Sequence, residues 1–247
     1  MLNKLDVRED GYYINSKKAF SSNSSLSQED IKASFDFAYD MTFGKVGAHR
    51  AYRSGGRQVR RNGQIFIDAF QGKLAEFAFY NLIKDKYPGV SAPDLSTMGL
   101  EEWDSYDFVI NDKKIAIKST KHFGQLFLLE TKDWNDNGDY IPNLESGNAR
   151  YDYFVLVRIK PEGVGIMKHH RWLYSDEVSK DDLQNAIMGE DWETEVTGYV
   201  DHSEIETIIN DGFVLPQGAM LNGGTSMDAE NYYVQAGDMH DISGLNI

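Results

Sequence analysis

The sequence predicts a single mixed α/β domain, in which helices flank a central mixed β-sheet. One helical periodicity of apolar residues runs from about Gln64 to Lys86 and ends at a Tyr-Pro-Gly turn. Strand-like runs rich in β-branched and aromatic residues follow it, at 106–110, 115–120, 126–130 and 153–159. Helical patterns then return, and this order of a helix, strands and further helices is typical of mixed α/β folds.

The first part of the chain predicts one additional helix. The polar first 25 residues end in a serine-rich loop, and Ser27 then has the features of a helix N-cap. Acidic residues in the first turn support that helix, and Gly44 predicts its end. We therefore assign 26–63 to this helix and the arginine-rich segment behind it, outside a core of roughly 64–190.

The second half of the chain predicts less regular structure after the buried run at 153–159. Residues 165–168 predict a returning strand, and the segments 176–188 and 203–210 carry helical signals. The last forty residues are rich in glycine, so we expect an irregular C-terminal extension over 200–247. The domain as a whole is expected to span 1–247.

Composition limits the classes of function. Hydrophobic residues make up 41% of the 247 residues, which is enough for a core, and no apolar run is long enough to span a bilayer. The N-terminus lacks the apolar segment of a secretory signal. The absence of cysteine excludes disulfides, thiolate zinc sites and cysteine nucleophiles. We expect a cytoplasmic protein without a membrane partner.

The charge is unevenly distributed along the chain. The net charge of −14 argues against nucleic acid as a partner, because phosphate contacts require lysine and arginine. Between Met41 and Ile67, however, there is no acidic residue, and the basic residues there are Lys45, Arg50, Arg53, Arg57, Arg60 and Arg61. This segment is either a solvated basic loop or a contact for a polyanion, and the complete exclusion of acids favours the second.

Two neighbouring strand-like runs carry a candidate site. Asp107 opens the first run, and Lys118 lies near the end of the second, beyond a polar turn. Because side chains alternate between faces, Ala116 and Lys118 share a face. A lysine in a mostly apolar strand requires an anion, since an unpaired buried ammonium is costly. Asp107 is one possible partner and a phosphate ester is another.

The long predicted helix adds a second acid. Glu76 lies among mostly apolar residues, and Gly72 one turn earlier would let a backbone or a ligand approach. Glu76 taken alone fits the solvent edge of the helix better than a functional site. Together with Asp107 it suggests a site for a hard divalent cation, because Mg²⁺ typically takes one or two carboxylates plus water and phosphate oxygens.

This order of Glu on a helix, Asp opening a strand and Lys closing the next resembles the PD-(D/E)xK nuclease superfamily, which includes type II restriction endonucleases. The resemblance covers roughly Gln71 to Lys160. Asp107 matches the metal-binding aspartate of the motif, Lys118 its lysine, and Glu76 the acid of the preceding helix. The chain departs from the motif at Ala116, where an acid is expected, and no proline precedes Asp107.

The resemblance implies a restriction-endonuclease-like core and a Mg²⁺-dependent endodeoxyribonuclease that cuts double-stranded DNA at a short specific sequence. Glu76, Asp107 and Lys118 would be catalytic, with Asp107 and Glu76 on the metal, or Glu130 in place of the missing acid. A homodimer would match a palindromic target. The residues expected to contact DNA are Arg50, Arg53, Arg57, Arg60, Arg61, Ser119 and Lys121.

Two other functions stay open at this point. If neither Glu76 nor Glu130 reaches a metal, the chain is a catalytically inactive nucleic-acid-binding module with the same fold. The third hypothesis is an acidic interaction protein that makes no contact with nucleic acid.

Overall fold

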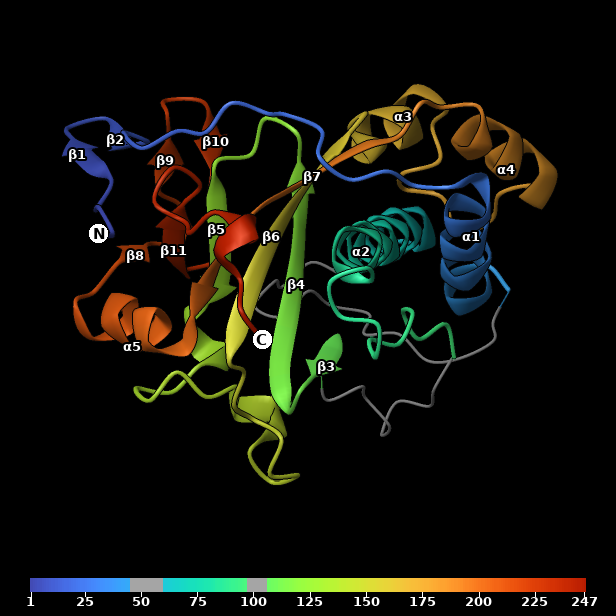
Figure 1. The fold of residues 1–247 in the computed structure, drawn as a ribbon. Helices are drawn as coiled ribbons and strands as arrows, with labels where there is room; N and C mark the ends of the chain where they lie inside the picture. Colours follow the sequence, from blue (N-terminus) through green and yellow to red (C-terminus); the bar gives the residue numbers. More distant parts are fainter. Residues whose placement is uncertain (45–59, 97–105) are drawn as a thin grey trace.

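The computed structural model describes residues 1–44, 60–96 and 106–247 (Figure 1). The helices are α1 (Gln28–Thr42), α2 (Asn62–Ile83), α3 (Gly163–His169), α4 (Lys180–Met188) and α5 (His202–Asn210), with short 3₁₀ turns at Thr131–Asp133, Ile141–Asn143 and Ile242–Gly244. The strands are β1 (Asp6–Arg8), β2 (Gly11–Tyr13), β3 (Phe108–Ile110), β4 (Lys113–Lys121), β5 (Leu126–Glu130), β6 (Tyr153–Lys160), β7 (Glu193–Asp201), β8 (Val214–Leu215), β9 (Met220–Leu221), β10 (Thr225–Ser226) and β11 (Asn231–Gln235).

A mixed sheet of strand order β3-β4-β6-β7 forms the centre of the molecule. β3 and β4 are antiparallel, β4 and β6 are parallel, and β6 and β7 are antiparallel. The predicted mixed α/β class is thereby confirmed. A parallel neighbour for β4 requires a crossover. Here the chain makes that crossover through β5, which belongs to a different sheet.

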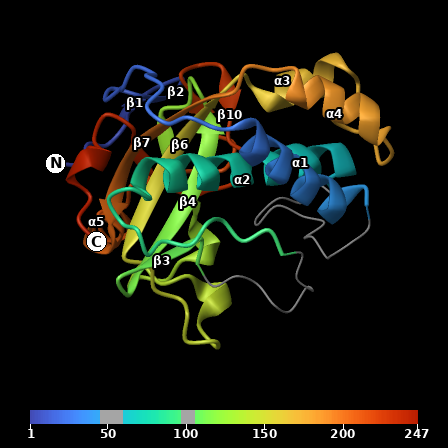
Figure 2. The same ribbon diagram turned by 45° about the vertical axis from the view of Figure 1, so that its right-hand side comes forward.

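The two faces of the central sheet bury two different cores. On β6, Val155, Val157 and Ile159 belong to the core that α2 completes, whereas Phe154 and Leu156 belong to the other. This alternation is what period-two side-chain geometry requires of a strand covered on both faces. Figure 1 shows α1 and α2 on one side of the sheet, with β5, β11 and α5 on the other, and Figure 2 shows α1 and α2 in front of the sheet.

The long helix α2 is confirmed close to its predicted bounds, and it is buried along most of its length. Its start fits tightly against the segment before α4, because a Cβ on Gly63 would lie 1.9 Å from the carbonyl oxygen of Trp172. The predicted N-cap of α1 is also confirmed, since the Ser27 side chain and Asp30 form a reciprocal capping box. The helices predicted at 176–188 and 203–210 correspond to α4 and α5.

Several expectations need correction. Residues 126–130 form a strand as predicted, but β5 pairs with β11 in the second sheet, of order β5-β11-β8. The strand expected at 165–168 is instead part of α3, whose Met167 is fully buried in the core beneath α2. The ending at 200–247 is not irregular, because it supplies α5 and the middle strand of the second sheet. Tertiary pairing decides these short elements more than local propensity does.

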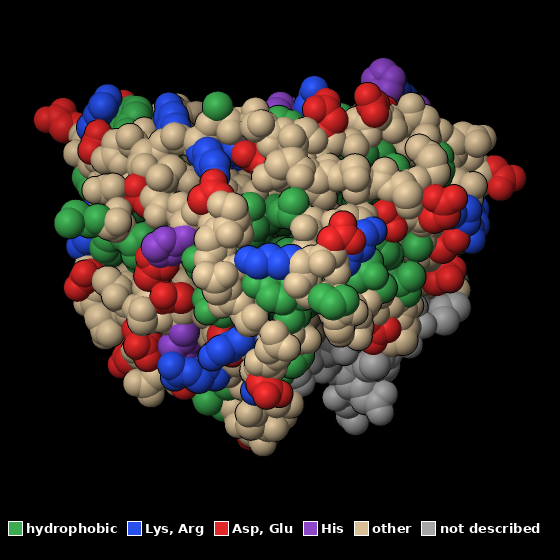
Figure 3. All heavy atoms as spheres, in the orientation of Figure 1, with side chains coloured by type: hydrophobic (Ala, Val, Ile, Leu, Met, Phe, Trp, Pro, Cys, Tyr) green, Lys and Arg blue, Asp and Glu red, His purple; other side chains and the backbone are tan. Residues whose placement is uncertain are grey.

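Charged side chains of both signs are interspersed over the face shown in Figure 3, and hydrophobic side chains are visible between them. Within the described parts of the chain, no helix combines the length and the apolar character that a membrane crossing requires.

Candidate functional site

The candidate site is built on a strand edge that β3 leaves open. β3 pairs with β4 only from Lys113 to Ile115, and no other described strand takes up that edge farther along. Asp107, directly before β3, continues the pairing with its side chain, because its Oδ2 accepts a hydrogen bond from the amide of Ile117 at 2.6 Å. The sequence position of Asp107 at the start of a short strand therefore places its carboxylate on the edge of β4.

The pKa of Asp107 shows how this position affects the carboxyl. The residue as a whole is exposed, yet loss of hydration around the carboxyl is the largest influence and raises its pKa. The positive charge of Lys118, the hydrogen bond from Ile117 and the charge of Lys73 all act in the opposite direction without outweighing it. Asp107 and Lys118 are thus close enough to interact electrostatically, as their sequence positions predict.

Glu76 is buried rather than at the solvent edge of its helix. Only 9% of the residue is exposed, and its Oε2 lies 2.8 Å from Nζ of Lys73, one turn earlier on α2. The Lys73 ammonium also lies over the ring of Phe37, 4.8 Å from the centroid. Because Lys73 pairs with Glu76 and also lowers the pKa of Asp107, it links the helix acid electrostatically to the strand acid.

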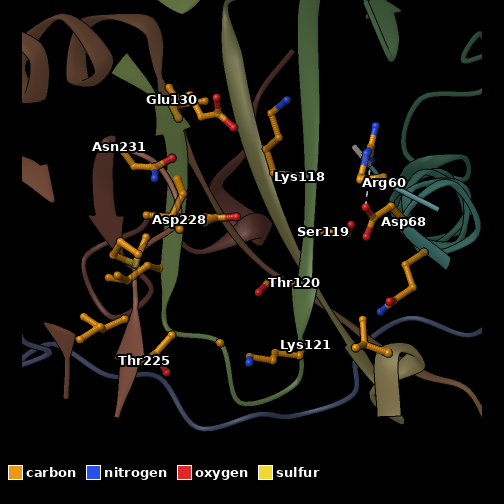
Figure 4. Close-up of a pocket in the computed structure, with 18 of the residues that line it drawn as sticks. Arg60, Asp68, Lys118, Ser119, Thr120, Lys121, Glu130, Thr225, Asp228 and Asn231 are labelled. Carbon is orange, nitrogen blue, oxygen red and sulfur yellow. Dashed lines mark hydrogen bonds and ion pairs between the residues drawn. The ribbon is translucent and has the colours of Figure 1, made fainter. Parts of the chain in front are cut away.

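A cavity of about 1100 Å³ opens beside this edge, where β4 and β5 diverge after their connecting turn (Figure 4). Lys118, Thr120 and Lys121 line it from β4, and Glu130 lines it from β5. Figure 4 shows Lys118 and Glu130 at the same end of the cavity, with the Glu130 carboxylate directed toward the strand that carries Lys118. Among the described residues, Glu76 and Asp107 are not part of this lining, so the cavity meets the candidate site at Lys118.

The surroundings of Ala116 disfavour an acid at the position where the nuclease motif has one. Ala116 is 3% exposed and belongs to the second core, together with Leu129 and Phe154. Ala116 and Lys118 lie on the same face of β4. The second sheet covers this face at position 116, whereas the face is open to the cavity at position 118. An acid at 116 would lose its hydration in apolar surroundings.

The donors for a Mg²⁺ ion are only partly assembled. Among the residues that the structure describes, no group of three or more His, Asp or Glu side chains has the geometry of a metal site. Mg²⁺ typically uses only one or two carboxylates, with waters and phosphate oxygens completing the shell. Asp107 fits such a role, because a carboxyl with a raised pKa gains from a neighbouring cation.

The alternative acid, Glu130, lies across the cavity from Lys118. One of its oxygens is 3.9 Å from Nζ of Lys132, and 22% of its side chain is exposed. A metal held by Glu130 would therefore bind in the cavity itself rather than at the edge of β4. The structure describes all three candidate acids, Glu76, Asp107 and Glu130, but it does not bring them into one cluster.

Of the residues expected to contact DNA, Arg50, Arg53 and Arg57 lie outside the described part of the chain. Arg60 lines the cavity and pairs with Asp68 at 3.0 Å, as the dashed line in Figure 4 shows. Arg61 is the N-cap residue of α2 and pairs with Asp176.

The two expected contacts on β4 both line the cavity. Ser119 lies on the strand next to Lys118, and Figure 4 shows it on the side of Asp68. Lys121 has its Nζ 3.9 Å from an oxygen of Glu162. The structure therefore brings Ser119, Lys121 and Arg60 to one cavity, while Arg61 is engaged at the start of α2.

Two residues of the site were not singled out from the sequence. Lys73 was detectable in principle, because a lysine three residues before Glu76 shares its helix face. No sequence pattern pointed to Tyr151. Its ring packs against Tyr106, Trp134 and Tyr140. Burial raises the pKa of Tyr151, and the negative charge of Asp107 raises it further, so the hydroxyl next to the strand acid stays protonated.

Comparison with known proteins gives no relatives: no protein-family model matches the chain, and no curated protein and no solved structure matches it. The resemblance to PD-(D/E)xK nucleases therefore stays a prediction. The interpretation of the site rests on the chemistry of the residues described above.

Proposed function

We propose that this protein is a Mg²⁺-dependent endodeoxyribonuclease of the type II restriction kind, which hydrolyses phosphodiester bonds in double-stranded DNA. The observation that supports it most is the position of Asp107 at the open edge of β4, with the charge of Lys118 beside it. The ammonium of Lys118 is on the cavity side of that edge, where a substrate has access.

Each residue has a role that its surroundings support. Asp107 accepts a hydrogen bond from the Ile117 amide through Oδ2, which orients the carboxylate, and this carboxylate would hold the cation. Glu76, or Glu130 from the cavity, would provide the second carboxylate. Mg²⁺ held by these carboxylates would supply Lewis-acid chemistry at the phosphoryl group. Lys118 would orient the attacking water and offset the negative charge that develops on the phosphoryl oxygens.

The substrate contacts follow from the cavity. Lys118, Lys121 and Arg60 provide positive charge in its lining, and Ser119 provides a hydroxyl donor. The basic residues outside the described ranges would add contacts to the duplex. Recognition of a palindromic site would take two copies of the chain, so the proposal includes a homodimer. The proposed location of this homodimer is the cytoplasm.

A second candidate function is a catalytically inactive nucleic-acid-binding module of the same fold. Ala116 favours it, because the motif acid is replaced by a residue buried in the second core. This candidate predicts DNA binding that does not require a metal and no cleavage under any conditions. Neutral replacements of Arg57, Arg60 and Arg61 together would abolish that binding.

Plasmid cleavage tests the proposal. The purified protein is incubated with plasmid and phage DNA in Mg²⁺ or Mn²⁺, and the ends of the products are sequenced. We expect cleavage at a specific short sequence, and a rate at least about 100-fold lower for Lys118→Ala, the usual effect of removing one electrostatic stabiliser. Lys160→Ala is the matched control, because this exposed lysine ends the neighbouring strand and pairs with Glu193.

An undiminished cleavage rate in Lys118→Ala would contradict the proposed mechanism. DNA retention in the presence of a chelator, without cleavage in Mg²⁺ or Mn²⁺, would favour the binding module instead. Failure to retain duplex or single-stranded DNA at any salt concentration would leave the acidic interaction protein as the better hypothesis.

A further inference from the structure

The turn that follows α3 carries basic residues that the described part of the fold does not use. Residues 168–171 are Lys-His-His-Arg in a chain whose net charge is −14, and all of them are exposed. The Lys168 ammonium and the Arg171 guanidinium make no ion pair or hydrogen bond with any described residue. By contrast, Lys160 at the end of β6 pairs with Glu193 at 2.6 Å. Figure 1 shows α3 and α4 together at one edge of the molecule, where this turn is accessible.

The backbone of Arg171 has a conformation that suits glycine. α3 ends in a Schellman motif, in which the Arg171 amide donates to the carbonyl oxygen of Lys168 at 3.0 Å and the Trp172 amide donates to that of Met167 at 2.8 Å. Arg171 directly follows the C-cap residue and has a φ of +61°. Glycine is usual at this position, because a Cβ disfavours the left-handed conformation. The sequence therefore has an arginine where helix capping favours glycine.

Arg171 is unusual among the described residues with a positive φ. The other non-glycine residues of this kind are Asn111, Asp112 and Asn222. Asparagine and aspartate tolerate the left-handed region, because their short polar side chains can form local hydrogen bonds. Lys168 has a structural reason for its charge, since it lies in the last turn of α3, where a cation interacts favourably with the helix dipole. The described fold gives no such reason for Arg171, and a backbone departure of this kind motivates a functional assignment.

The turn is attached to the start of α2. The Gly63 amide donates to the carbonyl oxygen of Ser175 at 3.0 Å, and Nδ2 of Asn62 donates to the carbonyl oxygen of Asp176 at 3.1 Å. Arg61 forms an ion pair with the Asp176 carboxylate. These contacts fix the position of the turn relative to α2, and the Arg61 pair offsets the negative charge of Asp176.

The basic turn continues a positive surface that begins in the cavity. Lys168 lines the cavity together with Lys121 of β4, and Arg171 lies beyond it at the end of α3. Tyr174 follows with 64% of the residue exposed, and it adds a hydroxyl donor to the same turn. Glu177 is an exposed acid at the far end of the turn, so the excess positive charge lies between the cavity and Arg171. A polyanion that occupies the cavity therefore meets Lys168 and Arg171 where it leaves.

We propose that the surface formed by Lys168 and Arg171 binds the phosphate backbone of double-stranded DNA outside the cavity, with Arg171 as the main contact. A guanidinium can bind a phosphate through two parallel hydrogen bonds. This inference rests on the proposed function, from which it takes DNA as the partner. Contacts to the backbone carry no sequence information, so Arg171 contributes to affinity and not to the choice of the site.

Arg171→Gly tests the contact, because it removes the guanidinium and supplies the residue that the backbone favours. Binding of the full chain to two duplexes of unrelated sequence is measured over a range of salt concentrations, with a chelator present to prevent cleavage. One lost phosphate contact makes the slope of log K against log salt concentration less steep by about 0.9, which is about an eightfold loss of affinity at about 0.1 M salt. We expect this loss for both duplexes, and a midpoint of thermal unfolding no lower than that of wild type.

Two further variants separate the contact from a general effect of charge. Lys180→Gln is the matched control, because Lys180 begins the neighbouring helix α4 and already pairs with Asp36 at 3.5 Å, so this variant should keep the wild-type slope. Arg171→Lys keeps the charge and should also keep that slope. A wild-type slope in Arg171→Gly, an equal change in Lys180→Gln, or a failure of the wild type to retain duplex DNA would overturn the inference.

Cleavage in Mg²⁺, measured separately, distinguishes this inference from the nuclease proposal. Binding that weakens in Arg171→Gly, in a protein that never cuts DNA, would keep the contact and contradict the nuclease. Cleavage by a protein whose Arg171→Gly variant binds with the wild-type slope would support the nuclease and overturn the contact.

Discussion

Two pairs of opposite charges on the central sheet differ in their burial and in their hydrogen bonding. Arg158 on β6 is fully buried, and its Nε donates to Glu195 of β7 at 2.6 Å. Its two other nitrogens donate to the backbone oxygens of Lys18 and Ala19 at 2.8 and 2.9 Å. Asp107 and Lys118, at the other edge, interact through charge, and Lys118 is exposed toward the cavity.

The difference separates a structural charge from one that we propose to be functional. Every nitrogen of the Arg158 guanidinium is used by the protein, and it ties the N-terminal segment at 18–19 to the sheet. Within the described residues, the candidate site leaves bonding capacity on Asp107 and Lys118 for a ligand. A buried charge that the fold satisfies is expected to control stability, whereas an accessible one is expected to control activity.

The largest expected effect on stability is that of Arg158→Met. The change leaves the Glu195 carboxylate buried without its cation, so we expect the free energy of unfolding to fall by about 3–5 kcal/mol. Denaturant unfolding measures it, with Lys160→Ala as the exposed comparison on the same strand. If Arg158→Met lost no more stability than Lys160→Ala, the assignment of Arg158 as the structural charge would be wrong.

Asp107→Asn should change stability in the opposite direction. The pKa of Asp107 is raised above its ordinary value of 3.8, so the folded protein binds more protons than the unfolded chain between the two values. The wild-type free energy of unfolding therefore falls as the pH rises through that window. The Asn variant lacks this loss, and it should be the more stable protein at neutral pH and equal to wild type at strongly acidic pH.

Denaturant unfolding at several pH values in the absence of divalent metal measures this difference. Asp112→Asn is a suitable control, because Asp112 lies in the exposed turn between β3 and β4. A neutral-pH stability of Asp107→Asn below that of wild type would show that the Asp107 carboxylate stabilises the fold, contrary to the functional assignment.

The smallest expected change in stability is that of a double variant in which both members of the buried Arg158–Glu195 pair are replaced. Replacing both partners, as Arg158→Met with Glu195→Met, leaves no charge buried alone, so the double variant should recover much of the stability lost by Arg158→Met. Recovery should stay incomplete, because the Lys18 and Ala19 carbonyls lose their donors. A double variant no more stable than Arg158→Met would instead place the whole effect in those two backbone contacts.

The parts of the fold that could be predicted have local signals. Ser27 and Asp30 predicted the start of α1, and the apolar periodicity predicted α2. Both signals come from residues close together in the sequence. Asp107 and Lys118 could be paired because a short turn joins their strands and keeps them close.

The parts that could not be predicted depend on pairing between distant segments. β5 has the residues of a strand, but its partner, β11, lies about a hundred residues later and is short. Nothing near Ala116 in the sequence indicates that it packs with residues of β5, so its apolar surroundings appear only in the folded protein. Lys18 and Arg158 illustrate the same limit, because their contact joins the two halves of the chain.

The most direct test of the central claim is a double-mutant cycle of DNA cleavage. Rates in Mg²⁺ are measured for wild type, Asp107→Asn, Lys118→Ala and the double variant. If both side chains serve one metal-dependent step, each single variant is strongly impaired and the double variant is little slower than the slower single one. Independent, multiplicative losses, or cleavage that persists in either single variant, would contradict a shared site at the edge of β4.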